Sequence, residues 1–253
     1  MSGAEVTLTP VGANLLLLEE NFEGTSFSGS RYLFRSAAEA FGVELSEQED
    51  NDWRALLGGA YLVDHLIDID KTDIMPHLTS VISGRGIPGL HLDTQVCFRN
   101  YILRQNESRY DDIMQRLGGV SRLAQRQAEA KTAHELIEVR LEEADLLAYL
   151  LALQTNTQEG AEPRERFNLW LRGWSRCGYL LDTFVDMDLD YENGDSGVRP
   201  TASSRATVAG AAVKESVTAI KNTPLRLIGK CALVGARYIM LDKKPDMTDL
   251  ERP

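Results

Sequence analysis

The chain has 253 residues, of which 43% are hydrophobic, so it can build a sizeable core. A net charge of −11 and an isoelectric point near 4.9 argue against a general affinity for nucleic acid or anionic membranes. Cys97, Cys177 and Cys231 show no metal-ligand spacing, and we interpret them as reduced core thiols of a cytoplasmic protein. We expect no signal peptide, because a basic n-region is missing, and no transmembrane segment.

Apolar residues recur at helical spacing along almost the whole chain, without strand-like alternation. A first helix is predicted over residues 30–41. Ser46 and Glu49 have the spacing of a capping box, which predicts that a second helix begins there and continues through Asp68. Pro76 and the glycine-rich residues 84–89 predict a loop.

The remaining two thirds of the chain also read as helices joined by short loops. A helix at about 110–117 should break at Gly118-Gly119, and Thr132 with Glu135 forms a second capping box that begins a helix to about residue 155. Further helices are predicted at about 93–104, 165–190, 206–221 and 224–241. We therefore predict one all-α domain over residues 1–253, an antiparallel helix bundle with flexible ends at 1–25 and 242–253.

Two of the predicted helices carry carboxylates at four-residue spacing. Asp64 and Asp68 lie in one, and Asp182, Asp186 and Asp190 lie in the other. Residues four apart share one helix face, so each segment predicts a short column of carboxylates. Like charges at that spacing destabilise a helix, and carboxylates beside leucine and valine are costly to bury. A hard divalent cation is the simplest compensation, and two facing columns would suit Mg²⁺ bound with phosphate oxygens.

Other interpretations of these acidic segments fit the residues less well. A single DxxxD on a helix is usually a solvated face, but two columns flanked by apolar residues favour a functional site. An EF-hand fails because Tyr191 stands where the calcium loop needs glycine and Gly197 where it needs glutamate. A di-iron bundle would need Glu-x-x-His pairs, which the sequence lacks.

On these motifs the chain resembles class I isoprenoid (terpene) synthases, as a divergent relative of the squalene/phytoene synthase branch. Asp64 to Asp68 is similar to the family's first DxxxD motif. The second motif, N-x-x-x-D-x-x-x-D, resembles the run Asp182, Asp186 and Asp190. The resemblance covers about residues 26–70, 135–200 and the last two helices. It implies a helical bundle around a central cavity, in which these five aspartates hold three Mg²⁺ ions.

The resemblance also assigns residues to the diphosphate group and to the carbocation. Ser28, Ser30 and Arg31 resemble the family's S-x-S-aromatic stretch, and Arg199 resembles an arginine that follows the second motif. Arg237, beside Tyr238, is a further diphosphate candidate. Aromatic faces can stabilise a carbocation, and the candidates placed nearest the acidic columns are Tyr61, Tyr179 and Phe184.

Two departures from the family pattern bear on the substrate. Tyr61 and Val185 stand where the family usually has arginines, and the chain has one helix fewer after its second motif. Head-to-head coupling must hold two prenyl chains, so these losses favour an enzyme that acts on one.

Three functions are consistent with the sequence. The first is a Mg²⁺-dependent terpene synthase, a lyase that ionises a linear C15 or C20 prenyl diphosphate and cyclises or quenches the cation. The second is a head-to-head prenyltransferase, and the third is a non-catalytic helical protein that binds partners through its acidic surface. Enzymes of this family often form homodimers, but substrate length, product skeleton and oligomeric state are not encoded in any motif.

Overall fold

The structure is a computed structural model that describes residues 6–7, 26–70, 72–88, 92–153 and 162–231, with the side chains of 6–7, 26–32 and 68 left out. Its helices are α2 (Ser26–Phe41), α3 (Glu47–Ile69), α4 (Met75–Ile82), α5 (Leu92–Leu103), α6 (Glu107–Glu129), α7 (Ala133–Leu153), α8 (Glu162–Asn193) and α9 (Ala202–Lys221). Residues 225–231 are also helical. The all-α prediction is therefore confirmed, while the predicted flexible ends lie outside the described residues except for Val6 and Thr7.

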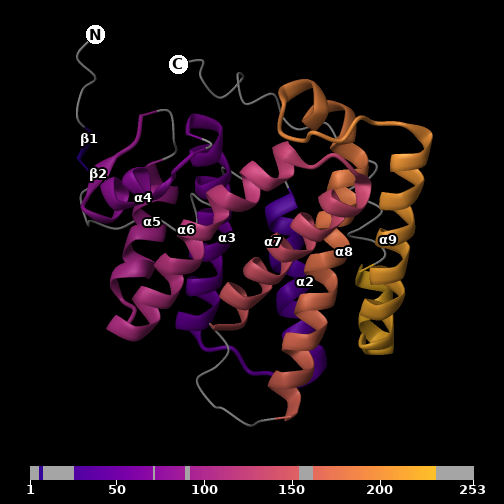
Figure 1. Cartoon of the computed structure of the whole chain (residues 1–253). Helices are drawn as coiled ribbons and strands as arrows, with labels where there is room; N and C mark the ends of the chain where they lie inside the picture. The colour runs from indigo at the N-terminus through magenta and orange to yellow at the C-terminus, as the bar shows by residue number, and fades with distance from the viewer. Residues whose placement is uncertain (1–5, 8–25, 71, 89–91, 154–161, 232–253) are drawn as a thin grey trace, which may run out of the picture.

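The helices pack side by side, with α7 near the middle of the molecule (Figure 1). Helix α8 packs against α7 on one side and α9 on the other, so these three helices form one flank. On the opposite flank α3 packs against α5, which also contacts the short helix α4. Within the described ranges, no helix is long and apolar enough to cross a membrane.

The predicted capping boxes fix two of the helix starts. The Ser46 hydroxyl accepts from the backbone N–H of Glu49, whose carboxylate accepts in return from the backbone N–H of Ser46, at the start of α3. Thr132 and Glu135 form the same reciprocal bonds before α7. A third box, in which Thr201 caps α9 together with Ser204, was not predicted.

Three local predictions were wrong. Helix α6 runs without a break through Gly118-Gly119, because neither glycine has a positive φ and the surrounding turns pack on neighbouring helices. Pro76, predicted to mark a loop, lies in the first turn of α4, where its missing N–H costs no hydrogen bond. A short antiparallel strand pair, β1 (Val6–Thr7) with β2 (Arg85–Gly86), also forms where no strand was expected.

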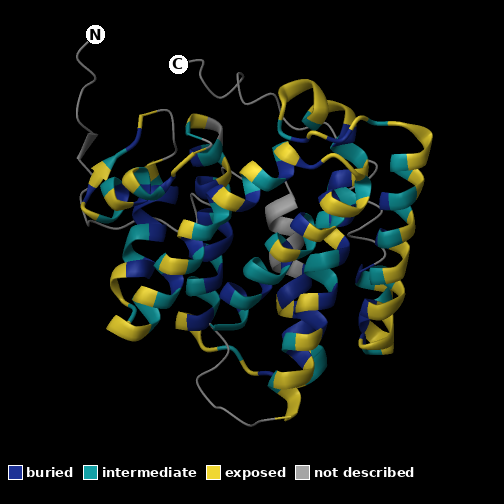
Figure 2. Ribbon diagram, in the orientation of Figure 1, coloured by how far each residue is buried: buried dark blue, intermediate teal, exposed yellow. Residues whose placement is uncertain are grey.

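The main core is rich in aromatic side chains that contact one another. Trp170 of α8 stacks on Phe167, which in turn stacks on Trp53 of α3, and Phe34 of α2 meets both tryptophans edge-on. The indole N–H of Trp53 donates to the backbone carbonyl of Leu151 at 2.9 Å. The space between α2, α3 and α8 is therefore filled by these rings, and buried residues line the inward faces of the helices (Figure 2).

A second, smaller core lies at the end of the bundle where α8 finishes. It gathers one buried residue each from the end of α6, from α7, from α8, from the loop after α8 and from α9, namely Ala130, Leu136, Met187, Val198 and Val208. This small core holds the C-terminal half of α8, and with it the predicted acidic column, against α7 and α9.

Candidate acidic site

The aspartates of the second motif lie along the margin of the buried face of α8. Thr183 and Met187 are almost fully buried, and the neighbouring Asp182, Asp186 and Asp190 are partly exposed. Their four-residue spacing places them one above the other on a single helix, as the sequence predicted. The column of carboxylates is therefore present, at the edge of the packing between α8 and its neighbours.

Arg140 of α7 is the cation that faces this column. Its guanidinium donates to the carboxylate of Asp182 at 2.8 Å, to that of Glu143 at 2.8 Å and to the hydroxyl of Thr183 at 2.9 Å. A longer bond of 3.4 Å reaches the side-chain oxygen of Gln127 on α6. Since the arginine side chain is only 13% exposed, these contacts supply the compensation that a buried charge needs.

Tyr179 completes the cluster from one turn earlier on α8. The centre of the Arg140 guanidinium lies 4.9 Å from the centroid of the Tyr179 ring, in a cation–π contact. Burial and the negative charges of Glu143, Asp182 and Asp64 raise the pKa of the tyrosine hydroxyl, which therefore keeps its proton at neutral pH. Asp64 belongs to the first predicted motif, on α3, and is one of the charges that act on this tyrosine.

Burial and the neighbouring carboxylates together shift the ionisation of the last aspartate. Burial, together with the charges of Asp182, Asp186 and Asp195, raises the pKa of Asp190 to about 6, although Arg140 opposes the shift. Burial likewise raises the pKa of Glu143.

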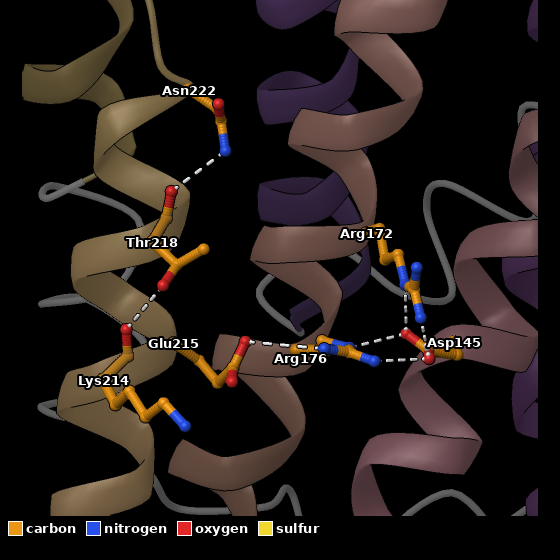
Figure 3. Close-up of polar contacts among 7 residues, drawn as sticks. All are labelled: Asp145, Arg172, Arg176, Lys214, Glu215, Thr218 and Asn222. Atoms are coloured by element: carbon orange, nitrogen blue, oxygen red, sulfur yellow. Dashed lines mark hydrogen bonds and ion pairs between the residues drawn. The ribbon is translucent and has the colours of Figure 1, made fainter.

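A network of ion pairs sets the relative positions of α7, α8 and α9 two turns away from the acidic column (Figure 3). The carboxylate of Asp145 on α7 receives two hydrogen bonds each from Arg172 and Arg176 of α8, all between 2.6 and 2.8 Å. Arg176 also approaches Glu215 of α9 at 3.9 Å. The two guanidinium groups outweigh the effect of burial and lower the pKa of Asp145 to about 2. This network holds the helices that carry Arg140 and Asp182 in fixed register.

The remaining residues predicted for the metal and the carbocation fall in different places. Asp64 is exposed, Asp68 belongs to α3 but its side chain is outside the described set, and Tyr61 packs partly buried against the main core. Phe184 is 36% exposed and lies one turn before Asp188, which forms an ion pair with Arg205 of α9. The structure thus gathers Tyr179 with the aspartates, whereas the hydrogen bond of Phe184 to α9 is made by its backbone carbonyl, which accepts from Arg205.

The predicted diphosphate ligands are only partly described. Arg199 is exposed in the loop after α8, where its carbonyl accepts from the hydroxyl of Ser204. Ser28, Ser30 and Arg31 belong to α2, but their side chains are outside the described set, and Arg237 lies outside the described residues altogether.

Whether these carboxylates suit Mg²⁺ depends on the residue. Among the described side chains, no three His, Cys, Asp or Glu residues converge as a metal-binding group. Mg²⁺, however, is usually held by one or two carboxylates and completes its shell with water and phosphate oxygens. Asp186 and Asp190, one turn apart in acidic surroundings, fit this requirement. Asp182 does not, because the guanidinium of Arg140 lies against its carboxylate.

Sequence reasoning missed Arg140 and Glu143, the partners that α7 supplies. A signal for them was present, because they fall in the inward stripe of α7 between the buried residues Leu136 and Ala144. Charged residues in an otherwise apolar stripe predict a buried ion pair or a site.

The surface near the site has a hollow that the acidic column does not line. It measures about 740 Å³ and lies where α6 ends and α7 begins, lined by Arg126, Ala128, Glu129, Ala130, Lys131, Glu135, Glu138, Val139 and Gly197. None of the predicted aspartates lines this hollow, so it does not support a substrate cavity. The central cavity implied by the family resemblance stays a prediction.

Compared with known proteins, the sequence matches no protein-family model, and no curated protein or solved structure is significantly similar. The functional conclusion therefore depends on the geometry of the acidic site and on the motifs of the sequence.

Proposed function

We propose that the protein is a class I enzyme that acts on a prenyl diphosphate, as a Mg²⁺-dependent terpene synthase for a C15 or C20 substrate. The observation that carries the proposal is the column of carboxylates on α8, with Tyr179 one turn before it and Asp64 of α3 among the charges that raise the pKa of this tyrosine. Burial, with Asp182 and Asp186, raises the pKa of Asp190 to about 6. Carboxylates gathered in this way are unfavourable unless cations compensate them.

The chain's own residues would share the work as follows. Asp186 and Asp190 would hold Mg²⁺, which when bound supplies the positive charge that stabilises a departing diphosphate. Tyr179, protonated because its pKa is raised, would donate a hydrogen bond or a proton and would not act as a phenolate base. Arg199, exposed in the loop after the acidic column, would bind the outer oxygens of the diphosphate.

The proposal is tested by incubating the purified protein with C10, C15 and C20 prenyl diphosphates and Mg²⁺, followed by gas chromatography with mass spectrometry. We expect a hydrocarbon or alcohol with the substrate's carbon number, lost in Asp186→Asn. The matched control is Asp188→Asn, which removes the same charge from the same helix on the side facing Arg205. It should keep the activity.

Two other outcomes would assign a different function. A product with twice the carbons of the substrate would indicate a head-to-head prenyltransferase. If none of the three substrates gives a Mg²⁺-dependent product, the proposed enzymatic activity is refuted. If, in addition, Mg²⁺ with pyrophosphate leaves the melting temperature unchanged, a non-catalytic acidic protein is supported, since ligands of the native state raise it. One observation already favours that function, namely that Arg140 compensates Asp182 without any ligand.

A further inference from the structure

Helix α9 lies at the outer edge of the bundle (Figure 1) and carries a row of exposed apolar residues. Its buried residues, Val208, Ala212 and Ala219, form the face that packs on α7 and α8. Beside that face, a second set of residues without polar side chains follows at alternating steps of four and three. This set, called here the α9 seam, consists of Ala206, Gly210, Val213, Val217 and Ile220, all of them exposed.

The exposure of the α9 seam is more than the scattered apolar surface of an ordinary protein. Its three large side chains, Val213, Val217 and Ile220, are between 43% and 63% exposed. Single exposed apolar residues are common and need no explanation, whereas a continuous row on one face marks a surface that another molecule covers.

The spacing of the α9 seam is that of a coiled-coil interface. Alternating steps of four and three keep five positions within about 80° of arc, at about 100° per residue. A row this narrow matches one facing helix, whereas helices that lie on a lipid surface present a wide apolar face with Trp, Phe and Leu. Since α9 has 20 residues and is therefore about 30 Å long, the seam can hold several turns of a partner helix.

Two lysines beside the α9 seam determine which charge a partner should carry. Among the charged residues of α9, Arg205 pairs with Asp188 of α8, and Glu215 also approaches an arginine of α8. The others, Lys214 and Lys221, are exposed, and neither forms a side-chain ion pair in the part of the chain that the structure describes. They are seven residues apart and each directly follows a seam residue, so both lie along the same edge of the seam.

A second copy of the chain and a lipid surface both fit the α9 seam less well than an acidic helix. Two seams face to face would gather four lysines and offer them no carboxylate, because Glu215 lies toward α8. Like charges at an interface oppose association. Anionic lipid would match the lysines, but the seam has no aromatic side chain to insert and the whole chain carries a net charge of −11.

We propose that the α9 seam is a docking surface for an amphipathic helix of a partner protein, with Asp or Glu beside its own apolar row. The partner's apolar side chains pack between Val213, Val217 and Ile220, and its carboxylates face Lys214 and Lys221. A single pair of helices buries little area, so the complex is a transient one. The inference is independent of the proposed enzymatic function, because no seam residue belongs to the acidic site.

The probe is a synthetic helical peptide of about 21 residues, with Ile and Leu at alternating steps of three and four and Glu in the flanking positions. Fluorescence anisotropy of the labelled peptide with the full-length protein should give a dissociation constant below about 100 µM, as for a transient complex. Val217→Asp should weaken binding by about tenfold or more, because it places a charge in the middle of the seam. The matched control is Leu103→Asp at the end of α5, an equally exposed apolar residue on the opposite flank, which should bind as the wild type does.

A charge exchange tests the role of the lysines separately. The double variant Lys214→Glu, Lys221→Glu should weaken binding of the acidic peptide by about tenfold, and a peptide with Lys in place of Glu should restore it. Since both lysines and Val217 are exposed, all variants should keep the wild-type melting temperature. Failure of the wild type to bind the acidic peptide, or equal binding of the acidic and basic peptides, would overturn the proposal.

Two further outcomes would assign the α9 seam to another occupant and overturn the proposal. A dimer seen by analytical ultracentrifugation of the full chain, and lost in Val217→Asp, would show that the seam pairs with a second copy. Sedimentation of the wild type with phosphatidylglycerol vesicles, lost in the same variant, would show that it lies on lipid.

Discussion

Gly197 lies in the loop that connects the acidic end of α8 to α9, and its replacement by alanine should destabilise the protein. A Cβ atom at this position would lie 2.4 Å from the carbonyl oxygen of Ala128 and 2.5 Å from that of Ala130. Both obstacles are backbone atoms at the end of α6, which cannot turn aside as a flexible side chain could. The loop would therefore have to move away from α6.

Two interactions would be weakened by that movement. The backbone N–H of Gly197 donates to the carbonyl of Gln127 at 3.3 Å, a bond worth about 1 kcal/mol. The next residue, Val198, is buried in the small core at 3% exposure, and complete burial of a valine stabilises by about 1.5–3 kcal/mol. Loss of the hydrogen bond and partial loss of the valine contacts predict that Gly197→Ala lowers the free energy of unfolding by about 2–4 kcal/mol.

Urea unfolding monitored by circular dichroism measures this loss, and the melting temperature should fall by roughly 5 to 15 °C. The matched control is Gly210→Ala in α9, where no atom lies within 4 Å of the new Cβ. Alanine there should stabilise by up to about 1 kcal/mol, because it favours the helix over the unfolded chain. A Gly197→Ala protein as stable as the wild type would refute the steric argument.

Two further predictions follow from ionisation. The pKa of Asp145 falls from 3.8 to about 2 on folding, so its ion pairs stabilise the protein above pH 4, and about 1–2 kcal/mol is lost as the pH falls toward 2. Asp145→Asn should be less stable at neutral pH, and its free energy of unfolding should fall less steeply below pH 4 than that of the wild type. The same pH dependence in both proteins, measured by urea unfolding, would contradict this. The pKa of Asp190 instead rises from 3.8 to about 6, so the native state loses stability as the pH rises through that range. Asp190→Asn should therefore be more stable than the wild type by about 1–3 kcal/mol near pH 7 and equally stable near pH 4. Equal stability of the two proteins at both pH values would contradict a raised pKa of Asp190.

The regular features of the fold could be predicted because they depend on short stretches of sequence. The capping boxes at Ser46 and Thr132 are local patterns, and both form. The carboxylate column of α8 follows from helical spacing alone. The inter-helix partner of Asp182 could not be found in this way, since Arg140 is 42 residues earlier on another helix. Only the packing of α7 on α8 brings them together.

The error at α6 has a tertiary cause, because packing overrides the preference of glycine for a helix break, whereas the error at α4 has a local one, because proline favours the first turn of a helix as well as a loop. The backbone N–H of Ile74, at the start of α4, donates to the hydroxyl of Ser121 on α6 at 3.1 Å. A Cβ at Gly118 would lie 3.4 Å from the sulfur of Met75, an ordinary van der Waals distance, and nothing lies within 4 Å of one at Gly119. The helix continues through the glycine pair because its neighbours hold it there, which no pattern within α6 expresses.

The small core at the end of α8 has a consequence for local opening of the protein. Its five residues, Ala130, Leu136, Met187, Val198 and Val208, come from five separate segments, so it closes only after all of them have docked. Few apolar contacts oppose its opening, in contrast to the aromatic core, and we expect the amide hydrogens of this region to exchange with solvent sooner. We therefore expect the acidic site to sit on the core that opens more readily than the aromatic one. A ligand that bridges α7 and α8 there would slow amide exchange across the whole end of the bundle.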